Sequence, residues 1–428
     1  MVKILRYGDR GSLVSLLQKG LERAGFELEV DGVFGEETRR QLTRFQRREG
    51  LTEDGVAGPA TEQALGPWYR GYTEHVIRPG DTLWSIAGRY GSRLALLESA
   101  NPGIDPFRLM AGQRIVVPFA FPVVPGDVPV SGELVGCCVE GLVARYPFLR
   151  AEEVGRSELG LPLWTLRFGE GPRRVFFSAA HHANEWITAL LLLRYTEDLA
   201  DALVRGEAVG GASAESIYER CQVTLLPLVD PDGVDLVTGA LGERETVYAA
   251  AIAAAFPTIP FPDGWKANLP GTDLNLQYPA LWDEAREVKF AQGFDRPAPR
   301  DYVGAAPLSA RESRAVYELT ERLDPALLMA FHTQGEVIYW KFQDREPPGS
   351  RELAVLFSAV SGYALEDVPY ASSFAGLKDW FILRYDRPGF TVEAGRGQNP
   401  LPLTELGEMI RRCTPMMTLA ALGEVGTA

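Results

Sequence analysis

An apolar stretch that runs into a histidine-containing turn constrains the fold of this chain more than any other segment. Residues 174–178 (Arg-Val-Phe-Phe-Ser) have the composition of a buried strand, and residues 182–188 read His-Ala-Asn-Glu-Trp-Ile-Thr. A helix is expected over residues 185–202, so this segment predicts a strand, a turn and a helix in an α/β sheet. Because residues three apart share one side of a helical turn, His182 and Glu185 can point at the same ion.

A third ligand for such an ion has few sources, because the chain contains four histidines. His332 follows the apolar run 326–331, and strand ends are where sites gather in α/β sheets. Two imidazoles and one carboxylate, with a position left open for water, form the ligand set of a hydrolytic zinc centre. A His-x-x-Glu pair alone is a weak signal. The wider pattern predicts one Zn²⁺, bound by His182, Glu185 and His332.

Four segments, in the same order along the chain, resemble the zinc metallocarboxypeptidase family of carboxypeptidase A type. They are residues 182–187, residues 265–268 (Trp-Lys-Ala-Asn) with 271–276 (Gly-Thr-Asp-Leu-Asn-Leu), residues 331–334, and residues 378–380 with 390–395. The resemblance implies an α/β catalytic domain, with a mixed, mainly parallel eight-stranded sheet covered by helices. Such a domain would be a zinc metallopeptidase.

The resemblance also implies a role for individual side chains. Glu393 corresponds to the general base that takes a proton from the attacking water. Asp273 corresponds to a carboxylate that fixes the tautomer of a ligand histidine. Lys266 takes the place of an arginine that stabilises negative charge on the scissile carbonyl, and a lysine can act there as a point charge.

Departures from the family pattern bear on the substrate. Carboxypeptidases of this type bind the terminal carboxylate with an Asn-Arg pair and an arginine between the first two ligands. Here Asn275 is kept, but Leu276 and Asn184 replace the two arginines. A planar group for binding a carboxylate is therefore missing. These differences disfavour an ordinary exopeptidase and favour a specialised amide substrate.

Two further residues are substrate-binding candidates. Lys378 precedes Asp379 where the family sets side-chain specificity, and we expect it either to pair with a substrate carboxylate or to be a solvated surface lysine. Tyr370 corresponds approximately to a mobile tyrosine of the family, although its spacing to Asp379 differs by one residue.

Two small modules precede the catalytic segments. Residues 1–68 resemble the bacterial three-helix peptidoglycan-binding domain, and the turn at Asp31-Gly32-Val33 is echoed at Asp54-Gly55-Val56. Residues 73–119 resemble the LysM module, a βααβ unit that binds glycans containing N-acetylglucosamine. We expect His75 to be structural and Trp84 to pack in the module's core. A linker over 120–131 and a catalytic domain over 132–428 complete the expected organisation.

This arrangement resembles the γ-D-glutamyl-diaminopimelate peptidases, which cut peptidoglycan stem peptides. The expected partners are peptidoglycan glycan strands and stem peptides or muropeptides, and the modules would raise the local substrate concentration. Two alternatives stay open. An ordinary metallocarboxypeptidase would release C-terminal amino acids, and a non-catalytic wall-binding protein would carry no metal.

The net charge of −14 disfavours binding to nucleic acid or to an anionic membrane surface. The N-terminal residues show no apolar signal core, and no stretch is long enough to cross a bilayer. We therefore expect a cytoplasmic, spore-associated or cell-wall-associated protein that reaches its site by a non-standard route.

Overall fold

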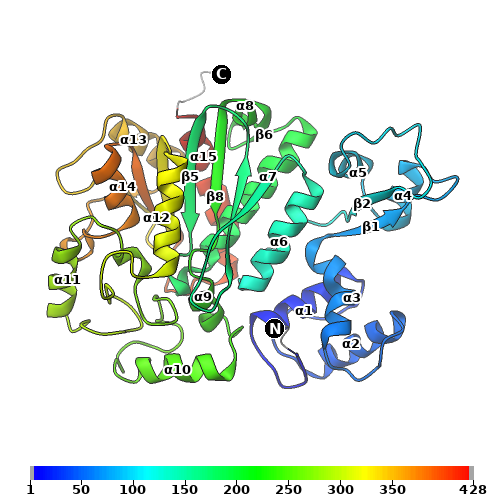
Figure 1. The fold of residues 1–428 in the computed structure, drawn as a ribbon, viewed down its shortest axis with the longest axis horizontal. Helices are drawn as coiled ribbons and strands as arrows, with labels where there is room; N and C mark the ends of the chain where they lie inside the picture. Colours follow the sequence, from blue (N-terminus) through cyan, green and yellow to red (C-terminus); the bar gives the residue numbers. More distant parts are fainter. Residues whose placement is uncertain (1–3, 424–428) are drawn as a thin grey trace. The chain divides into compact units, whose positions relative to one another are not determined.

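The computed structural model describes residues 4–423 and divides into two compact units, Met1–Arg150 and Ala151–Ala428. In the described part of the chain, no helix combines the length and the apolar character needed to span a membrane. Figure 1 shows the elements of both units, with labels on most of the helices and on some of the strands. Residues far apart in the sequence meet in the second unit, which contains all the candidate site residues.

Three helices begin the first unit: α1 (Ser12–Arg23), α2 (Glu36–Arg48) and α3 (Pro59–Arg70). A buried glutamine in each of the first two helices binds the turn that follows it. The Gln18 side chain donates to Asp31 Oδ1 at 2.7 Å and accepts from Gly32 N at 2.8 Å. Gln46 makes the same contacts with Asp54 and Gly55, at 2.8 and 2.9 Å. The repeated Asp-Gly turn thus has one structural cause at both sites.

The LysM-like segment has the expected βααβ order: β1 (Tyr72–Val76), α4 (Leu83–Tyr90), α5 (Leu94–Ala100) and β2 (Arg114–Pro118). His75 is buried, and its ring contacts Asp81 Oδ2 at 2.8 Å and the Tyr90 hydroxyl at 3.1 Å. Its structural role is therefore as expected. The expectation for Trp84 was wrong, because its side chain is 78% exposed.

The segment between β2 and α6 (Gly132–Arg145) is not a free tether within the first unit. The buried Arg145 guanidinium donates to the carbonyls of Gly71, Phe119 and Phe121 at 3.2, 2.9 and 2.9 Å. In addition, Phe119 N donates to Gly71 O at 2.9 Å. The two ends of the LysM-like segment are therefore joined at one point. The domain bounds given above stay a prediction.

An eight-stranded sheet forms the centre of the second unit, with strand order β11-β10-β12-β9-β5-β8-β4-β3. Neighbours β12 and β9, β9 and β5, β5 and β8, and β10 and β11 are parallel, whereas β10–β12 and β4–β8 are antiparallel. The sheet is mixed, as the family resemblance implies. Its strands are β3 (Arg150–Arg156), β4 (Pro162–Phe168), β5 (Arg173–Ala179), β8 (Cys221–Leu226), β9 (Leu327–His332), β10 (Val337–Tyr339), β11 (Ala364–Leu365) and β12 (Gly389–Glu393).

Helices cover both faces of this sheet. Successive strand residues point to opposite sides, so apolar residues on both faces are buried against helices. Phe176 of β5 packs with residues of α12 and α14, whereas the neighbouring Phe177 contacts Tyr195 of α7 with 6.4 Å between ring centroids. Figure 1 shows α12 and α7 on either side of β5 and β8. The helices are α7 (Ile187–Arg205), α8 (Ala214–Arg220), α9 (Pro231–Val237), α10 (Glu243–Ala253), α11 (Trp282–Ala291), α12 (Arg311–Leu323), α13 (Ser350–Ser361), α14 (Leu377–Tyr385) and α15 (Leu406–Leu422).

Candidate active site

Three adjacent parallel strands bring the predicted metal ligands and the predicted general base to one edge of the sheet, where the carboxyl ends of the strands lie. The strand β5 ends at Ala179, just before His182, while β9 ends at His332 and β12 ends at Glu393. The register pairs Glu393 directly with His332. Because carboxyl ends of parallel strands meet at one edge, residues separated by more than 200 positions become neighbours.

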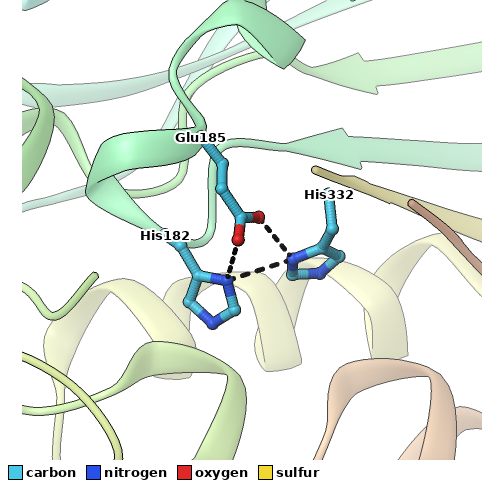
Figure 2. Close-up of side chains that lie close together, drawn as sticks. All are labelled: His182, Glu185 and His332. Atoms are coloured by element: carbon cyan, nitrogen blue, oxygen red, sulfur yellow. Dashed lines mark hydrogen bonds and ion pairs between the residues drawn. The ribbon is translucent and has the colours of Figure 1, made fainter. Parts of the chain in front are cut away.

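The three predicted ligands converge within this edge, as Figure 2 shows. Glu185 lies on the short 3₁₀ helix η1 (Ala183–Glu185), which connects β5 to α7. Its Oε1 lies 3.0 Å from His182 Nδ1, and its Oε2 lies 2.9 Å from His332 Nδ1. The two Nδ1 atoms are 3.2 Å apart, and the three ligand atoms lie within 4.8 Å of one another.

This geometry suits a tetrahedral cation. Zn–N bonds of about 2.0–2.1 Å at tetrahedral angles place two nitrogen ligands roughly 3.3 Å apart, close to the separation of the two Nδ1 atoms. The local charge favours a cation as well. Burial disfavours the charged ring of His182, but Glu185 and Asp273 outweigh burial and raise its pKa to about 9. The residues present therefore fit a zinc ion.

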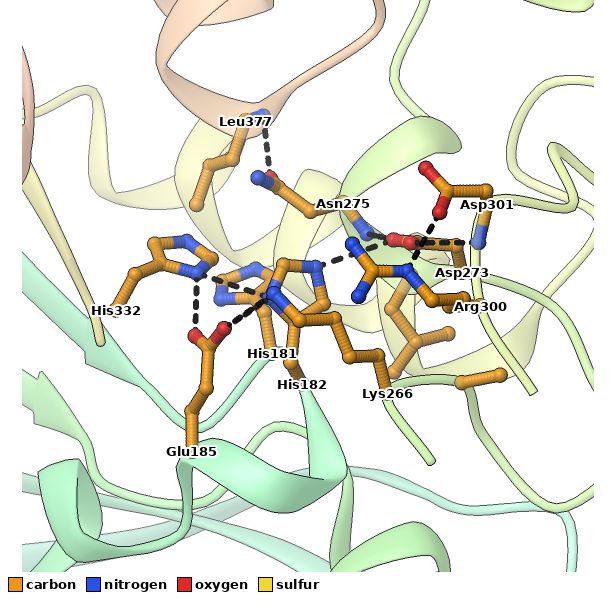
Figure 3. Close-up of polar contacts among 12 residues, drawn as sticks. His181, His182, Glu185, Lys266, Asp273, Asn275, Arg300, Asp301, His332 and Leu377 are labelled. Atoms are coloured by element: carbon orange, nitrogen blue, oxygen red, sulfur yellow. Dashed lines mark hydrogen bonds and ion pairs between the residues drawn. The ribbon is translucent and has the colours of Figure 1, made fainter. Parts of the chain in front are cut away.

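Asp273 fixes the orientation of the first ligand ring. Its Oδ1 lies 3.2 Å from His182 Nε2, the nitrogen that faces away from Glu185 (Figure 3). The same carboxylate accepts from the backbone N–H groups of Asn275 and Asp301, each at 3.2 Å. Burial opposes ionisation of Asp273, but the nearby His182 outweighs it and holds the pKa of Asp273 below its ordinary value.

A cleft of about 220 Å³ opens onto this site and is lined by, among others, His182, Lys266, Asp273, Asn275, His332 and Glu393. Lys266 Nζ lies 2.7 Å from Glu185 Oε1. Burial lowers the pKa of Lys266, but the adjacent Glu185 outweighs it, so the net direction is upward and the side chain is cationic. Burial raises the pKa of the Glu393 carboxyl, as suits a group that accepts a proton.

Comparison with known proteins identifies the fold and its chemistry. Residues 138–406 match the zinc carboxypeptidase family. The chain belongs to this family. It is a zinc metallopeptidase, and the cluster of His182, Glu185 and His332 is positioned like the metal site. Residues 10–65 match a putative peptidoglycan-binding domain and residues 75–118 match the LysM domain.

Relatives extend this assignment. The gamma-D-glutamyl-L-diamino acid endopeptidase 1 of Lysinibacillus sphaericus is 40% identical over 382 residues, which cover 77% of this chain and 95% of that protein. The N-acetylmuramoyl-L-alanine amidase CwlL of Bacillus licheniformis is 45% identical over 65 residues, 14% of this chain and 18% of the amidase. The structure of bovine thrombin-activatable fibrinolysis inhibitor, 17% identical, superposes with a TM-score of 0.53 over 69% of this chain and 97% of its own. This last likeness concerns the fold alone.

Two of the predicted substrate-binding residues lie in the cleft of this zinc metallopeptidase. Asn275 accepts from Leu377 N at 3.1 Å through Oδ1. Lys378 is 4% exposed, so the surface-lysine alternative was wrong. Its ammonium contacts Asp379 Oδ1 at 2.5 Å and the Lys341 carbonyl at 2.7 Å. A substrate carboxylate would have to compete with Asp379 for it.

The other two predicted residues lie elsewhere. Asn184 is buried, and its amide donates to the Asp263 carbonyl at 2.9 Å rather than lining the cleft. Tyr370 is 71% exposed and lines an adjoining recess of about 250 Å³, which shares Lys378 and Asp379 with the cleft. Their contacts with substrate stay predictions.

Among the polar residues of the cleft that sequence reasoning missed are Tyr339 and Arg300. Tyr339, at the end of β10, lines the cleft close enough to Glu393 for that carboxylate to add to burial in raising the pKa of its hydroxyl. Arg300 lines the cleft from a proline-flanked loop that has no motif of its own. Neither residue carries a sequence signal, because each reaches the site through tertiary packing.

Proposed function

We propose that this zinc peptidase hydrolyses the amide bond between a γ-D-glutamyl residue and the diamino acid that follows it in peptidoglycan stem peptides. The observation that carries the proposal is the likeness to the Lysinibacillus sphaericus endopeptidase, because it covers 77% of this chain and 95% of that protein. The name of that relative specifies the γ-D-glutamyl-L-diamino acid bond.

The N-terminal modules support a substrate in the cell wall. A catalytic domain that binds its substrate weakly gains from modules that keep it on the same polymer. Matches to a peptidoglycan-binding domain and a LysM domain within one chain fit that purpose. We therefore propose that the protein associates with the wall and acts there on stem peptides or on muropeptides released from it.

The chain's own residues support a hydrolytic mechanism. When bound, zinc would polarise the scissile carbonyl and lower the pKa of a water molecule. Glu393 would then accept the proton of the attacking water and deliver it to the leaving amine, a role that its raised pKa favours. Lys266 would stabilise the negative charge that develops on the carbonyl oxygen. Asp273 would keep the His182 ring oriented through Nε2.

Charged groups near Lys378 support a substrate with ionised ends. Lys378 and Asp379 line both the cleft and the adjoining recess, and Lys341 and Asp367 also line the recess. A diamino acid carries an ammonium group, and in diaminopimelate a second carboxylate, at the end of its side chain. We propose that Lys378 contacts this carboxylate, as its position predicts.

The decisive experiment is incubation of the zinc-loaded full-length chain with defined peptides, followed by mass spectrometry. The substrates are L-Ala-γ-D-Glu-diaminopimelate, its α-linked isomer and a simple peptide with a free C-terminus. We expect cleavage of the γ-linked peptide at the glutamyl carbonyl and little turnover of the other two. The Glu393→Gln variant is the matched inactive control.

Other outcomes would contradict the proposal. Preferential release of the last residue from the simple peptide would identify an ordinary carboxypeptidase. No turnover of any peptide, together with no zinc by elemental analysis after zinc loading, would identify a wall-binding protein without catalysis.

A further inference from the structure

The cleft contains an arginine that the family motifs do not predict. The motif positions that would carry arginine are Leu276, which is buried, and Asn184, whose amide is directed at a backbone carbonyl. Arg300 nevertheless lines the same cleft as Asn275 and Glu393. Its side chain is 41% exposed, so its guanidinium can meet a ligand from solvent.

Backbone hydrogen bonds fix this arginine relative to the catalytic residues. On one side, the carbonyl of Pro299 accepts from Lys266 N at 2.7 Å. On the other side, Asp273 N donates to Tyr302 O at 2.8 Å, and Asp301 N donates to Asp273 Oδ2 at 3.2 Å. The backbone of Arg300 is therefore held between the segments that carry Lys266 and Asp273. A group positioned in this way binds a ligand at a reduced entropic cost.

The other cations of the cleft are already paired with carboxylates. Lys266 contacts Glu185 at 2.7 Å, Lys289 contacts Asp301 at 2.6 Å, and Lys378 contacts Asp379 at 2.5 Å; each is largely buried.

Arg300 differs because only its Nε is engaged, at 2.6 Å from Asp301 Oδ2. Within residues 4–423, its two terminal nitrogens make no hydrogen bond or ion pair. Figure 3 shows the guanidinium beside Asp301 and Asp273. These two nitrogens form the planar pair that binds a carboxylate with two parallel hydrogen bonds.

We propose that Arg300 binds a carboxylate of the substrate and supplies, from a loop, the planar cation that Leu276 cannot provide. The choice of carboxylate rests on the proposed function. A γ-glutamyl linkage leaves the α-carboxylate free on the residue that supplies the scissile carbonyl, and the diamino acid of a tripeptide ends in a second carboxylate. Both present the same chemistry to a guanidinium, and an α-linked peptide lacks the first.

Three matched peptides separate these sources: the γ-linked tripeptide, the same peptide with an amide at the glutamyl α-carboxyl, and the same peptide with an amide at the C-terminus. Each is assayed with the wild type, Arg300→Gln and Arg300→Lys, all zinc-loaded. We expect Arg300→Gln to lower kcat/KM for the unmodified tripeptide by roughly 10- to 100-fold, the range of a hydrogen bond to a charged group, mainly through KM.

The pattern across peptides identifies the carboxylate. The kcat/KM of the wild type should fall by a similar factor on one of the two amidated peptides. For Arg300→Gln, kcat/KM on that amidated peptide should be little lower than on the unmodified tripeptide. For the unmodified tripeptide, the kcat/KM of Arg300→Lys should lie between the values of the wild type and of Arg300→Gln, because lysine keeps the charge without the planar pair of nitrogens. Arg296→Gln is the matched control, since Arg296 is on the same loop, is 59% exposed and pairs with its neighbour Asp295. It should behave as the wild type does.

Binding gives a second readout. Calorimetry of the tripeptide with Glu393→Gln and with the Glu393→Gln, Arg300→Gln double variant should show weaker binding in the double variant by the same factor. If Arg300→Gln discriminates against both amides as strongly as the wild type does, the proposal is wrong. If the wild type instead prefers α-linked peptides, the proposed function fails, and the C-terminal amide still tests Arg300.

Discussion

Glu393 lies directly opposite His332 in the parallel register of β12 and β9, and the ladder continues through a hydrogen bond from Ala394 N to His332 O at 2.8 Å. The candidate base and a candidate metal ligand therefore share one rigid ladder. Neither can shift along its strand without breaking that pairing. Placement on central strands of a sheet gives the pair a precision that a loop would not provide.

Replacing Glu393 with glutamine should abolish most hydrolysis without removing the metal. The amide keeps the shape of the side chain but cannot accept the water proton, so we expect kcat to fall by about 10²- to 10⁴-fold. Turnover of the γ-linked tripeptide and zinc content by elemental analysis check the two halves of this prediction. A variant with near-normal kcat would show that another group accepts the proton.

Replacing Asp273 with asparagine should weaken zinc binding by roughly 10- to 100-fold, because the partner of His182 Nε2 loses its charge. Competition with a chromogenic chelator measures the change in affinity. Asp283→Asn, at an exposed position of α11, is the control and should bind zinc as the wild type does. An unchanged affinity in Asp273→Asn would mean that the contact does not support the metal.

A buried carboxyl of α12 should make the second unit less stable as the pH rises. Burial raises the pKa of Glu312 to about 7 from an ordinary 4.5, so the folded state favours the protonated form. The resulting stabilisation is complete below about pH 4.5 and is lost as the pH rises through about 7. Its size is on the order of 3 kcal/mol.

The test compares the free energy of unfolding at pH 5 and pH 8. Glu312→Gln cannot ionise at this position and should lose less stability across that range than the wild type. Glu318→Gln changes an exposed residue of the same helix and should keep the slope of the wild type. Equal slopes in all three proteins would show that Glu312 titrates normally.

Truncation of two nearby residues of α4 should change the free energy of unfolding by very different amounts. Trp84→Ala removes a side chain that is 78% exposed and should change the free energy of unfolding by less than about 0.5 kcal/mol. Ile86→Ala empties a fully buried position and should cost roughly 2–5 kcal/mol. Denaturant unfolding of the first unit's signal distinguishes them, and a large loss in Trp84→Ala would place the indole in the core.

The position of the site at the carboxyl ends of the strands could be predicted, because the motifs that contain its residues are local. His182 and Glu185 lie three residues apart after an apolar strand, and His332 and Glu393 each end another one. The mixed eight-stranded sheet then follows from the family resemblance, whereas its strand order comes from the structure. The error at Trp84 was avoidable: the buried residues Leu83, Ile86 and Ala87 have helical spacing that places position 84 on the other face.

The rest of the site depends on contacts that no local pattern encodes. Whether Lys378 is solvated or buried depends on its pairing with Asp379 and on the carbonyl of Lys341, 37 residues away in the chain. Arg300 reaches the cleft because hydrogen bonds on both sides of its loop, to Lys266 and Asp273, place it there. Neither composition nor periodicity predicts the burial of Lys378 or the position of Arg300.

The hydrogen bond between Phe119 N and Gly71 O makes the LysM-like segment a cassette. The chain enters and leaves this segment at one point, where the Arg145 guanidinium donates to the carbonyls of both Gly71 and Phe119. A different insert whose two ends lie equally close together could therefore replace the segment between these two residues without changing the path of the flanking chain. Ends that lie close together are the feature that lets a domain be inserted or exchanged without disturbing its neighbours.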